Sequence, residues 1–474
     1  MARTIAISPV TRVEGHGKVT IHLNDDNEVE RSHFHVVEYR GFEKFCEGRL
    51  LSEMPVITTR ICGICPVSHH LASAKACDAA LGVEIPPTAK MLRELMHMAQ
   101  IIHSHAVHFF HLAAPDFLLG PDSDPATRNI IGIMRTNPEL AKRAIRLRQI
   151  GQDLIERVGG RPIHPVTAIP GGMSKPLSHE DRFKSRQDIQ EAVELAQLGI
   201  SVGKEALEKH SDLIPRFAAI ETNYLGLVKG GNLELYDGQL RLVDRGGKLL
   251  EEFEPSTYLE HIGERVEDWS YLKFPFYRKL GYPEGTYRVG PLGRLNVADA
   301  VSTPLANAEH RAFKQLGGGG PVHPTLYYHL ARLIEILYAV ERAGELLDDD
   351  GIVSREVRVV ATRQAGEGVG VIEAPRGTLI HHYWCDDLGK IERANLIVAT
   401  GHNNPAMDAS VNAVAKEFVK GGNIQEGLLN RVEMAVRCYD PCLSCATHAV
   451  GRMPLRLQTL APDGSIVDTV VRES

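Results

Sequence analysis

Two short stretches near opposite ends of the chain each contain a pair of cysteines with two residues between them. The four cysteines are Cys62, Cys65, Cys442 and Cys445. This spacing lets both sulfur atoms of a pair turn toward one point, so each pair can bind a metal. Four thiolates inside a protein carry four negative charges, which a metal centre can balance. We therefore expect the fold to join both ends of the chain around one buried metal site.

The spacing alone leaves two kinds of metal site open. Zinc ribbons usually place their two cysteine pairs about 15–20 residues apart, whereas nearly the whole chain separates the pairs here. Soft thiolates also suit iron, nickel and copper. Structural zinc and a redox-active transition metal are therefore equally compatible with the four cysteines. The remaining cysteines stand alone, and we interpret them as small buried core residues. They are Cys46, Cys77, Cys385 and Cys438.

Composition predicts a globular protein that is not directed to nucleic acid or membranes. The 474 residues are 43% hydrophobic by type, which suits a large core in two or three lobes or in one α-rich unit. The net charge of −7 is spread along the chain, so we expect no nucleic-acid partner. We find no apolar leader and no apolar run of about 18 residues. We therefore expect no membrane span and a cytoplasmic location, where thiols stay reduced.

Periodicity predicts a helix-rich α+β chain. Helices are expected at 66–82, from 86 to beyond 109, and at 138–158, 186–212, 324–347 and 405–420. Strands are expected at 18–23, 32–39, 234–236, 240–243, 357–361, 370–373, 377–383, 394–399, 455–460 and 465–471. The helix that starts near residue 86 carries five histidines, which we interpret as packed core residues rather than metal ligands. No GxGxxG fingerprint is present, so we do not expect the chain itself to bind NAD or FAD.

The wider motifs resemble those of the large, catalytic subunit of [NiFe] hydrogenases. The matching stretches are Arg60-x-Cys62-Gly63-Ile64-Cys65-x-x-x-His69, Asp440-Pro441-Cys442-x-x-Cys445-x-x-His448, Arg12-Val13-Glu14-Gly15-His16, Arg40-Gly41-Phe42-Glu43 and Ala374-Pro375-Arg376-Gly377. The resemblance covers essentially the whole chain and is strongest to the soluble bidirectional, NAD-reducing branch. It implies a hydrogenase large-subunit fold, with a central bundle of long helices and small β-sheets at its periphery.

The resemblance also implies the metals and the reaction. The four cysteines would bind nickel, and Cys65 and Cys445 would also bridge to an iron that carries carbonyl and cyanide ligands. Reversible, heterolytic cleavage of H₂ would follow, with Cys442 as the first proton base. Glu14 would relay the proton toward solvent. By position alone, Glu14 would be interpreted as a surface carboxylate, and the resemblance reverses that interpretation.

Further residues are implied to surround this centre. Arg376 would lie over the open site, held by Asp116 and Asp440, because buried carboxylates can pair with a guanidinium. Three residues would lie close to the iron and its ligands. These are His69, as a donor to a bridging sulfur, and Pro375 and Thr400, which would line the cyanide pocket.

A magnesium site and a cleavage point are also implied near the end of the chain. The magnesium would be bound by Glu43, His448 and the main-chain carbonyl of Leu396. A maturation endopeptidase would cut directly after His448. Residues 1–448 would then form a single large-subunit domain, and residues 449–474 would be a propeptide.

The expected partners follow from the use of all four paired thiols at one site. Electrons would leave through a small subunit that carries iron–sulfur clusters, and diaphorase subunits with FMN would pass them to NAD⁺. Within the hydrogenases, an F420-non-reducing enzyme and an NADP-linked sulfhydrogenase-type enzyme are alternatives. Outside them, the alternatives are a metal-free, quinone-binding subunit of a respiratory complex and a structural zinc protein.

Overall fold

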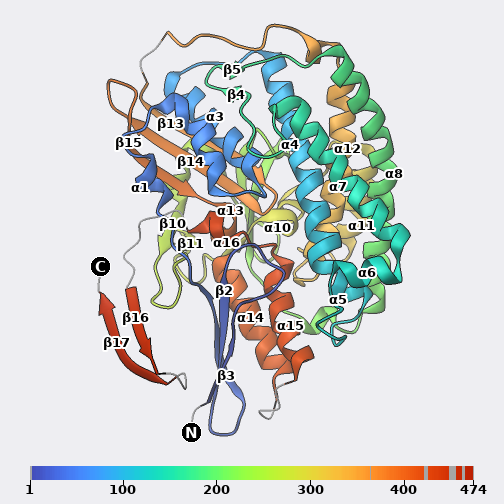
Figure 1. Cartoon of the computed structure of the whole chain (residues 1–474), viewed down its shortest axis with the longest axis vertical. Coiled ribbons are helices and arrows are strands. Elements are labelled where there is room, and N and C mark those ends of the chain that lie inside the picture. Colours follow the sequence, from blue (N-terminus) through green and yellow to red (C-terminus); the bar gives the residue numbers. More distant parts are fainter. Residues whose placement is uncertain (1–2, 363–364, 421–424, 448–454, 462–464, 473–474) are drawn as a thin grey trace.

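The computed structural model describes residues 3–362, 365–420, 425–447, 455–461 and 465–472. A bundle of long helices occupies one side of the molecule, and a three-stranded sheet with its covering helix occupies the other (Figure 1). The expected helix-rich α+β architecture is confirmed. Among the described residues, no helix combines the length and apolar character needed to cross a bilayer.

Four long helices form the bundle. They are α4 (Pro87–Ala106), α7 (Pro138–Gly159), α8 (His179–Lys209) and α12 (Tyr327–Asp348). Local signals set their ends: Asn137 Oδ1 accepts a hydrogen bond from the Leu140 amide (3.1 Å) at the start of α7, and Gly160 ends it at φ 78°. Such caps satisfy backbone groups that the helix itself leaves unpaired. The predicted start of α8 is wrong by about two turns, because Ser178 caps the helix through the Asp181 amide.

Three of the five histidines, His97, His105 and His108, are buried core residues, as predicted, whereas His103 and His111 are only partly buried. His97 Nε2 hydrogen-bonds to the Glu373 carbonyl (2.9 Å), and His105 Nε2 lies 2.9 Å from Glu335 Oε2. Glu335 also accepts two hydrogen bonds from the buried Arg294. Beyond Ala106 the helix widens into a π-helical turn, Val107–Ala113. The bundle interior is therefore joined to the strand segment at Glu373 by the His97 imidazole and by Arg294, which forms buried ion pairs with both Glu335 and Glu373.

These buried histidines predict a loss of stability on acidification. Burial lowers the pKa of both His97 and His105 to about 3, whereas the unfolded chain protonates them near the ordinary pKa of 6.5. Below that pH the unfolded state binds protons that the folded state excludes, so the free energy of unfolding falls. We expect a slope of about 1.4 kcal/mol per pH unit for each histidine.

Denaturant unfolding of the purified chain between about pH 7.5 and about pH 5.5 would measure that slope. His97→Gln should lower the slope by about 1.4 kcal/mol per pH unit, which is the contribution of one histidine. A stability that does not change over this interval would contradict the prediction.

The three-stranded sheet places one turn beside the first cysteine pair. It contains β13 (Glu367–Ala374), β14 (Gly377–Cys385) and β15 (Ile391–Ile397), all antiparallel. Helix α3 (Pro66–Leu81) lies directly on β13. A Cβ at Gly368 would lie 2.2 Å from the Ala76 carbonyl oxygen, and one at Gly370 would lie 2.1 Å from that of Ala72. Only glycine fits at these two positions, so α3 can approach β13 closely. The turn between β13 and β14 therefore lies beside the start of α3.

The remaining strands form small peripheral sheets. β1 (Arg3–Ile7), β2 (Gly17–Leu23) and β3 (Val29–Val36) form an antiparallel sheet. The strands expected at 18–23 and 32–39 correspond to β2 and β3, although β3 begins and ends three residues earlier. A second sheet contains β12 (Tyr287–Arg288), β6 (Asn223–Lys229), β8 (Gln239–Val243), β9 (Leu249–Phe253) and β7 (Asn232–Leu233). The strand expected at 234–236 is wrong, because the Glu234 carboxylate binds the amides of Leu235 and Tyr236. The strand expected at 357–361 reduces to one bridge at Arg358.

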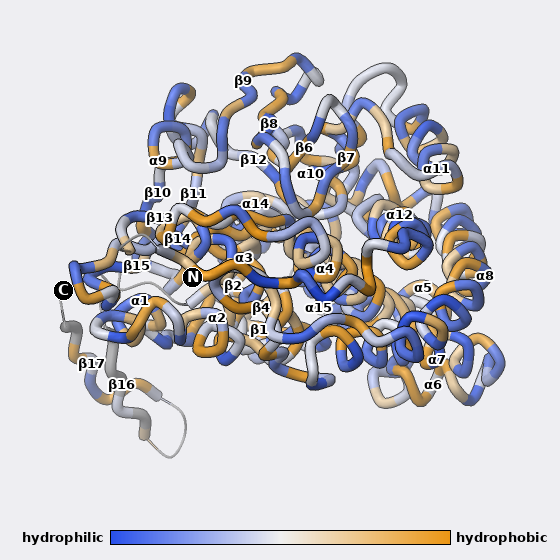
Figure 2. The backbone as a smooth tube through the Cα atoms, turned by 90° about the horizontal axis from the view of Figure 1, so that it is seen from above, coloured by the Kyte–Doolittle hydropathy of each residue, from blue (hydrophilic) through white to orange (hydrophobic). Residues whose placement is uncertain are grey.

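After β15, three helices lead the chain back to the centre of the molecule. These are α14 (Asn404–Phe418), α15 (Glu426–Cys438) and α16 (Leu443–Ala446). A hairpin of β16 (Leu455–Leu460) and β17 (Ile466–Arg472) lies beside the body of the molecule (Figures 1 and 2). In Figure 2 the outer helix α8 alternates between hydrophilic and hydrophobic positions, as expected for a helix that covers a core.

The shorter elements connect these parts. They are α1 (Phe42–Cys46), α2 (Met54–Ile57), α5 (Ala114–Leu118), α6 (Ile130–Thr136), α9 (Tyr258–His261), α10 (Gly290–Val297), α11 (Pro304–Gln315), α13 (Ala399–His402), β4 (Ala168–Ile169), β5 (Gly172–Met173), β10 (Ile262–Arg265) and β11 (Phe274–Tyr277).

Candidate metal centre

The fold brings the two cysteine pairs together, as predicted from their spacing. The first pair lies in the loop before α3, whose first turn begins at Pro66. The second pair lies at the short helix α16. Sγ of Cys62 lies 3.2 Å from that of Cys442, and Sγ of Cys65 lies 3.3 Å from that of Cys445. In the described part of the chain, these four buried thiols form a group whose sulfur atoms all lie within 4.8 Å.

The electrostatics of the four thiols fit a bound cation. Burial raises the pKa of Cys442 and of Cys445 well above the usual range. Hydrogen bonds from Cys442 and Cys445 lower the pKa of Cys62. Without a cation, the four thiols therefore keep some of their protons instead of all ionising to thiolates. A soft metal ion would deprotonate all four sulfurs, because a coordinated thiol exists as its thiolate.

A small, mostly apolar cavity lies against the thiols. Its volume is about 10 Å³, which is room for roughly one water-sized molecule. Its wall contains Cys65, His69, Ala374, Pro375, Arg376, Leu379, Val398, Ala399, Thr400, Cys442 and Cys445. Thr400 Oγ1 accepts a hydrogen bond from the Cys442 amide (2.9 Å), so its own proton can be donated elsewhere. The structure thus places Pro375 and Thr400 beside the thiols.

Arg376 contributes the guanidinium of this cavity. Its Nε donates to the Asp440 carbonyl (2.7 Å), and its Nη2 donates to Asp440 Oδ1 (3.1 Å). Its Nη1 donates to Ser104 Oγ on α4 (3.2 Å). Burial opposes its charge, but Asp440 and the neighbouring thiolates keep the pKa of Arg376 well above its ordinary value. A fixed positive charge therefore faces the thiols.

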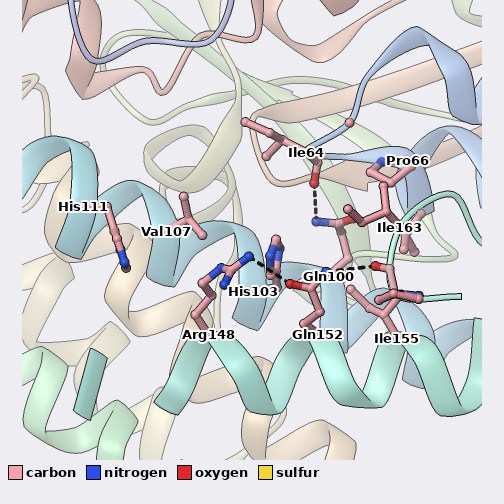
Figure 3. Close-up of a pocket in the computed structure, with 13 residues that line it drawn as sticks. Ile64, Pro66, Gln100, His103, Val107, His111, Arg148, Gln152, Ile155 and Ile163 are labelled. Carbon is pink, nitrogen blue, oxygen red and sulfur yellow. Dashed lines mark hydrogen bonds between the residues drawn. The ribbon is translucent and has the colours of Figure 1, made fainter. Parts of the chain in front are cut away.

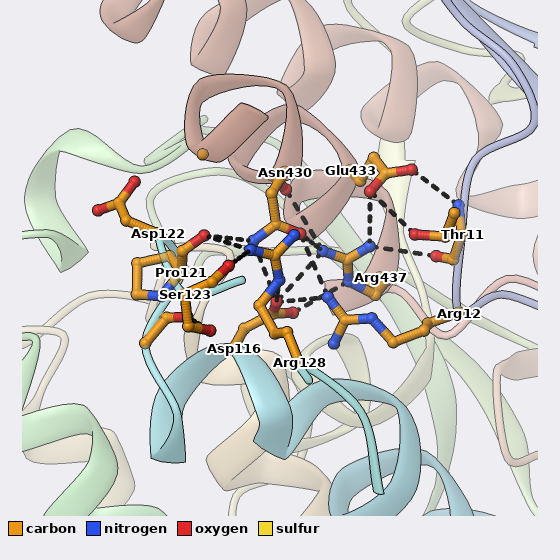
Figure 4. A network of polar contacts seen from close by, with 12 residues as sticks. Thr11, Arg12, Asp116, Pro121, Asp122, Ser123, Arg128, Asn430, Glu433 and Arg437 are labelled. Atoms are coloured by element: carbon orange, nitrogen blue, oxygen red, sulfur yellow. Dashed lines mark hydrogen bonds and ion pairs between the residues drawn. The ribbon is translucent and has the colours of Figure 1, made fainter. Parts of the chain in front are cut away.

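The expectation that Asp116 also holds Arg376 is wrong. Asp116 accepts hydrogen bonds from Arg12 Nη2 (2.5 Å), Arg437 Nε (3.0 Å) and Asn430 Nδ2 (3.1 Å) (Figure 4). Ser104 and Asp116 are twelve residues apart on consecutive helical segments, a separation of roughly 18 Å along an ideal helix axis. The Ser104 hydroxyl, which carries no charge to signal it in the sequence, meets Arg376 instead.

Glu14 lies beside the second cysteine pair. Its backbone forms a parallel bridge with Cys442, and its carbonyl accepts a hydrogen bond from the Leu443 amide (3.0 Å). Its Oε2 accepts a hydrogen bond from the Ser444 amide (3.1 Å). A Cβ at Gly15, where φ is 83°, would lie 2.7 Å from the Leu443 Cβ. Glycine is therefore required for this close approach of the two loops.

A buried hydrogen-bonded chain begins at His69. His69 Nδ1 lies 3.1 Å from His381 Nε2, and His381 Nδ1 lies 2.7 Å from the Tyr383 hydroxyl. Tyr383 in turn donates to Ser73 Oγ (3.0 Å). Burial lowers the pKa of His69 to about 4. Its Nε2 is buried without a protein partner among the described residues, which suits a hydrogen bond to a group bound at the thiols.

His381 and Tyr383 were not predicted from the sequence. A signal was present, because the two residues alternate along β14 and therefore lie on one face. Cys77 and Cys438 are buried single thiols, as expected, and Cys46 is also buried, whereas Cys385 is only partly buried.

The structure brings together part of the expected magnesium site. Glu43, on α1, accepts a hydrogen bond at Oε1 from the Leu396 amide on β15 (2.7 Å). His448 lies outside the described residues. The carbonyl of the preceding residue, Thr447, accepts hydrogen bonds from the amides of Arg40 (3.0 Å) and Gly41 (3.3 Å). The end of the second cysteine segment is thereby anchored to a segment that lies just before Glu43 in the chain.

Comparison with known proteins agrees with this geometry. Residues 40–122 and 235–448 match the family model described as nickel-dependent hydrogenase, and residues 4–39 match a model described as HoxL-like. The chain is 46% identical to the vhc F420-non-reducing hydrogenase protein of Methanococcus voltae, over 98% of this chain and 99% of that protein. It is 43% identical to the beta subunit of the NAD-reducing hydrogenase HoxS of Cupriavidus necator, over the full length of both.

A solved structure extends the likeness to three dimensions. The fold matches an NAD⁺-reducing [NiFe]-hydrogenase in its H₂-reduced state with a TM-score of 0.92 and 46% identity, over 94% of this chain and 99% of that chain. The regions that match the nickel-dependent hydrogenase model include both cysteine pairs. The chain therefore belongs to the nickel-dependent hydrogenase family, as a [NiFe] hydrogenase large subunit that acts on H₂.

Proposed function

We propose that this chain cleaves H₂ reversibly and heterolytically and sends the electrons, through a partner iron–sulfur subunit, to NAD⁺. The observation that carries the proposal is the group of four buried thiols next to Arg376 and Glu14. Support for NAD⁺ comes from full-length identity to the beta subunit of NAD-reducing HoxS and from the fold match. The identity to F420-non-reducing hydrogenases favours that branch as the second candidate.

The four thiols would hold a nickel–iron centre. Cys62, Cys65, Cys442 and Cys445 would bind nickel, and Cys65 and Cys445 would also bind iron. Such a centre supplies a soft, electron-rich site that polarises H₂. The apolar wall around Pro375 and the hydroxyl of Thr400 suit carbonyl and cyanide ligands. The unpaired Nε2 of His69 is suited to a hydrogen bond with a bridging sulfur.

The protein residues would guide the proton. The Cys442 sulfur accepts it and passes it to the Glu14 carboxylate, whose loop is paired with the Cys442 segment. Arg376, fixed by Asp440 and Ser104, holds a positive charge next to the cavity. A preorganised charge of this kind stabilises developing negative charge without reorganisation during the reaction.

Arg376→Lys should lower the rate of H₂ oxidation by about 10²-fold. A lysine cannot make the paired bonds from Nε and Nη2 to Asp440, because its ammonium is a single point of charge. The nickel content should remain unchanged, and the rate of dye reduction with H₂ measures the effect. As a control, Arg216→Lys changes an exposed arginine that pairs with Glu417 and should have no effect. A normal rate in Arg376→Lys would contradict the assigned role.

The end of the chain carries two linked proposals. Glu43, the Leu396 carbonyl and His448 would bind magnesium, which is supported by the contact of Glu43 with Leu396. An endopeptidase would cut after His448, leaving residues 1–448 as one domain and removing 449–474. The largest buried hydrophobic cluster draws its residues from Ile5 through Ala446, and the family match ends at residue 448; both support this division. Mass spectrometry of active, nickel-loaded protein tests it, since a retained tail would contradict it.

A cavity beside the first cysteine pair supports a docking face for the small subunit. It has a volume of about 290 Å³ and lies between the Cys62–Cys65 loop and helices α4 and α7 (Figure 3). Gln100 Nε2 donates to the Ile64 carbonyl at its wall (3.0 Å). A Cβ at Gly63 would meet no atom within 4 Å, so a partner can approach the loop between the thiols closely.

The experiment that tests the function is copurification of the chain with its partner subunits, followed by assay with H₂ and NAD⁺. The proposal predicts H₂-dependent NADH formation. Activity with a viologen dye but not with NAD⁺ would keep the hydrogenase and exclude the NAD-linked branch. Diaphorase subunits with FMN should be present in the NAD⁺-active complex.

A further inference from the structure

We infer that Asp116 is a positioning residue for the proton relay, which it serves by fixing the Glu14 loop against the second cysteine pair. The inference rests on the proposed role of Glu14. Asp116 lies outside the metal cavity and is only 1% exposed. Its carboxylate joins two segments that both lead to the relay, one from the start of the chain and one from its end.

Three guanidinium groups converge on the Asp116 carboxylate. Arg12 Nη2 lies 2.5 Å from Oδ1, Arg437 Nε lies 3.0 Å from Oδ2, and Arg128 Nε lies 3.6 Å from Oδ1. The Asn430 amide adds a hydrogen bond of 3.1 Å. Figure 4 shows these groups pointing toward Asp116 from three separate segments, because Asn430 and Arg437 both lie on α15. These partners compensate the buried negative charge of Asp116, which would be unfavourable without them.

A second carboxylate completes the attachment of the first segment. Glu433, on α15, accepts hydrogen bonds from the Thr11 amide (2.8 Å) and the Thr11 hydroxyl (3.0 Å). Arg437 Nη1 donates both to the Thr11 carbonyl (3.1 Å) and to Glu433 Oε2 (3.3 Å). The backbone at Thr11 and the side chain of Arg12 are therefore bound to the last turns of α15, on either side of Arg437.

Both bound segments reach the relay within a few residues. Arg12 lies two residues before Glu14, and Arg437 lies five residues before Cys442. Each connection passes through a non-glycine residue in the left-handed region, Arg12 at φ 56° and Asp440 at φ 53°. Residues with a side chain rarely adopt this conformation unless surrounding contacts hold it. The register of Glu14 against Cys442 therefore depends on contacts at Asp116.

The charge of Asp116 is needed as well as its shape. Burial and the neighbouring Arg437 lower the pKa of Arg12, while Asp116 acts in the opposite direction. If an asparagine replaced Asp116, three arginines would converge on a neutral group and would repel one another. The amide would also present one acceptor oxygen instead of two. Arg12 would move away from Arg437 and would take the Glu14 loop with it.

A double-mutant cycle between Asp116→Asn and Glu14→Gln tests the inference. The readouts are the rate of H₂/D₂O exchange and the nickel content of the holoenzyme. We expect Asp116→Asn to slow exchange about 10- to 100-fold with nickel retained, because a small misplacement of a reacting group has effects of that size. The double variant should be no slower than Glu14→Gln alone, because Asp116 acts through Glu14.

The possible results separate the inference from the proposed function. If the two losses multiply in the double variant, or if Asp116→Asn exchanges at the normal rate, the inference is overturned and the relay role of Glu14 stands. If Glu14→Gln itself exchanges normally, both are overturned.

Two further variants keep the test interpretable. If Asp116→Asn does not accumulate as folded protein, Arg12→Lys replaces it in the cycle, since it keeps the charge and loses the fork-shaped contact. The double variant of Arg12→Lys and Glu14→Gln should then exchange no more slowly than Glu14→Gln alone. If the two losses of exchange rate multiply, the inference is overturned. Asp122→Asn is the control, because Asp122 is an exposed carboxylate that pairs with Arg431 on the same helix α15. It should exchange at the normal rate.

Discussion

Cys442→Ala is expected to remove nickel from the protein and to reduce H₂ oxidation to background. Three thiols would remain, and burial makes it unfavourable for them to carry charge without a metal. The missing sulfur is also the proposed first proton base, so a residual three-thiolate site would still lack that step. Elemental analysis and an H₂-dependent dye assay measure the two losses separately.

A neighbouring cysteine supplies the matched control. Cys438 is buried four residues upstream, but its sulfur faces His329 Nε2 at 3.5 Å instead of the thiol group. Cys438→Ala should therefore keep its nickel and most of its activity. Nickel retained at the wild-type level in Cys442→Ala would contradict the assignment of this thiol as a ligand.

Glu14→Gln should lower H₂/D₂O exchange by about 10³-fold while the metals remain bound. Proton transfer by a positioned carboxylate typically contributes about 10²–10⁴-fold, and a glutamine side chain cannot carry the proton. The glutamine keeps the size of the side chain and can still accept the hydrogen bond of the Ser444 amide. The loop should therefore stay in place, which isolates the effect of the lost acid–base group.

The control for Glu14 is Glu38→Gln, a carboxylate of the same N-terminal region that pairs with His16 away from the thiols. It should exchange at the normal rate. A normal exchange rate in Glu14→Gln would show that protons leave by another route.

Much of the fold could be predicted because its signals are local. The start of α7 follows from its Asn137 cap, and the start of α12 and the two strands of the β2–β3 hairpin follow from periodicity to within a few residues. Strand β6 and helix α15 were missed. Strand β6 is buried along nearly its whole length between other strands, so it lacks the alternation that marks a half-exposed strand. Helix α15 does carry apolar residues at helical spacing, and this signal was overlooked.

The group of four thiols could be predicted from spacing, whereas the residues around it were expected only from the family resemblance, and one of their contacts was wrong. Cysteine pairs are a strong signal because few other uses of thiols require that spacing. The partner of Arg376 is a different case. Asp116 carries the charge that a buried arginine is expected to need, yet Ser104 makes the contact. Which side chain faces inward is decided by helix phase and by the π-helical turn, and neither is visible in one sequence.

The central claim is that four thiols from opposite ends of the chain hold a nickel–iron centre. Elemental analysis of this chain separated from its iron–sulfur partner subunits, combined with the infrared spectrum of the holoenzyme, tests this claim most directly. The account predicts nickel and iron in equal amounts at this chain's site, with absorption bands of carbonyl and cyanide ligands. Zinc in place of both metals, with no such bands, would contradict it.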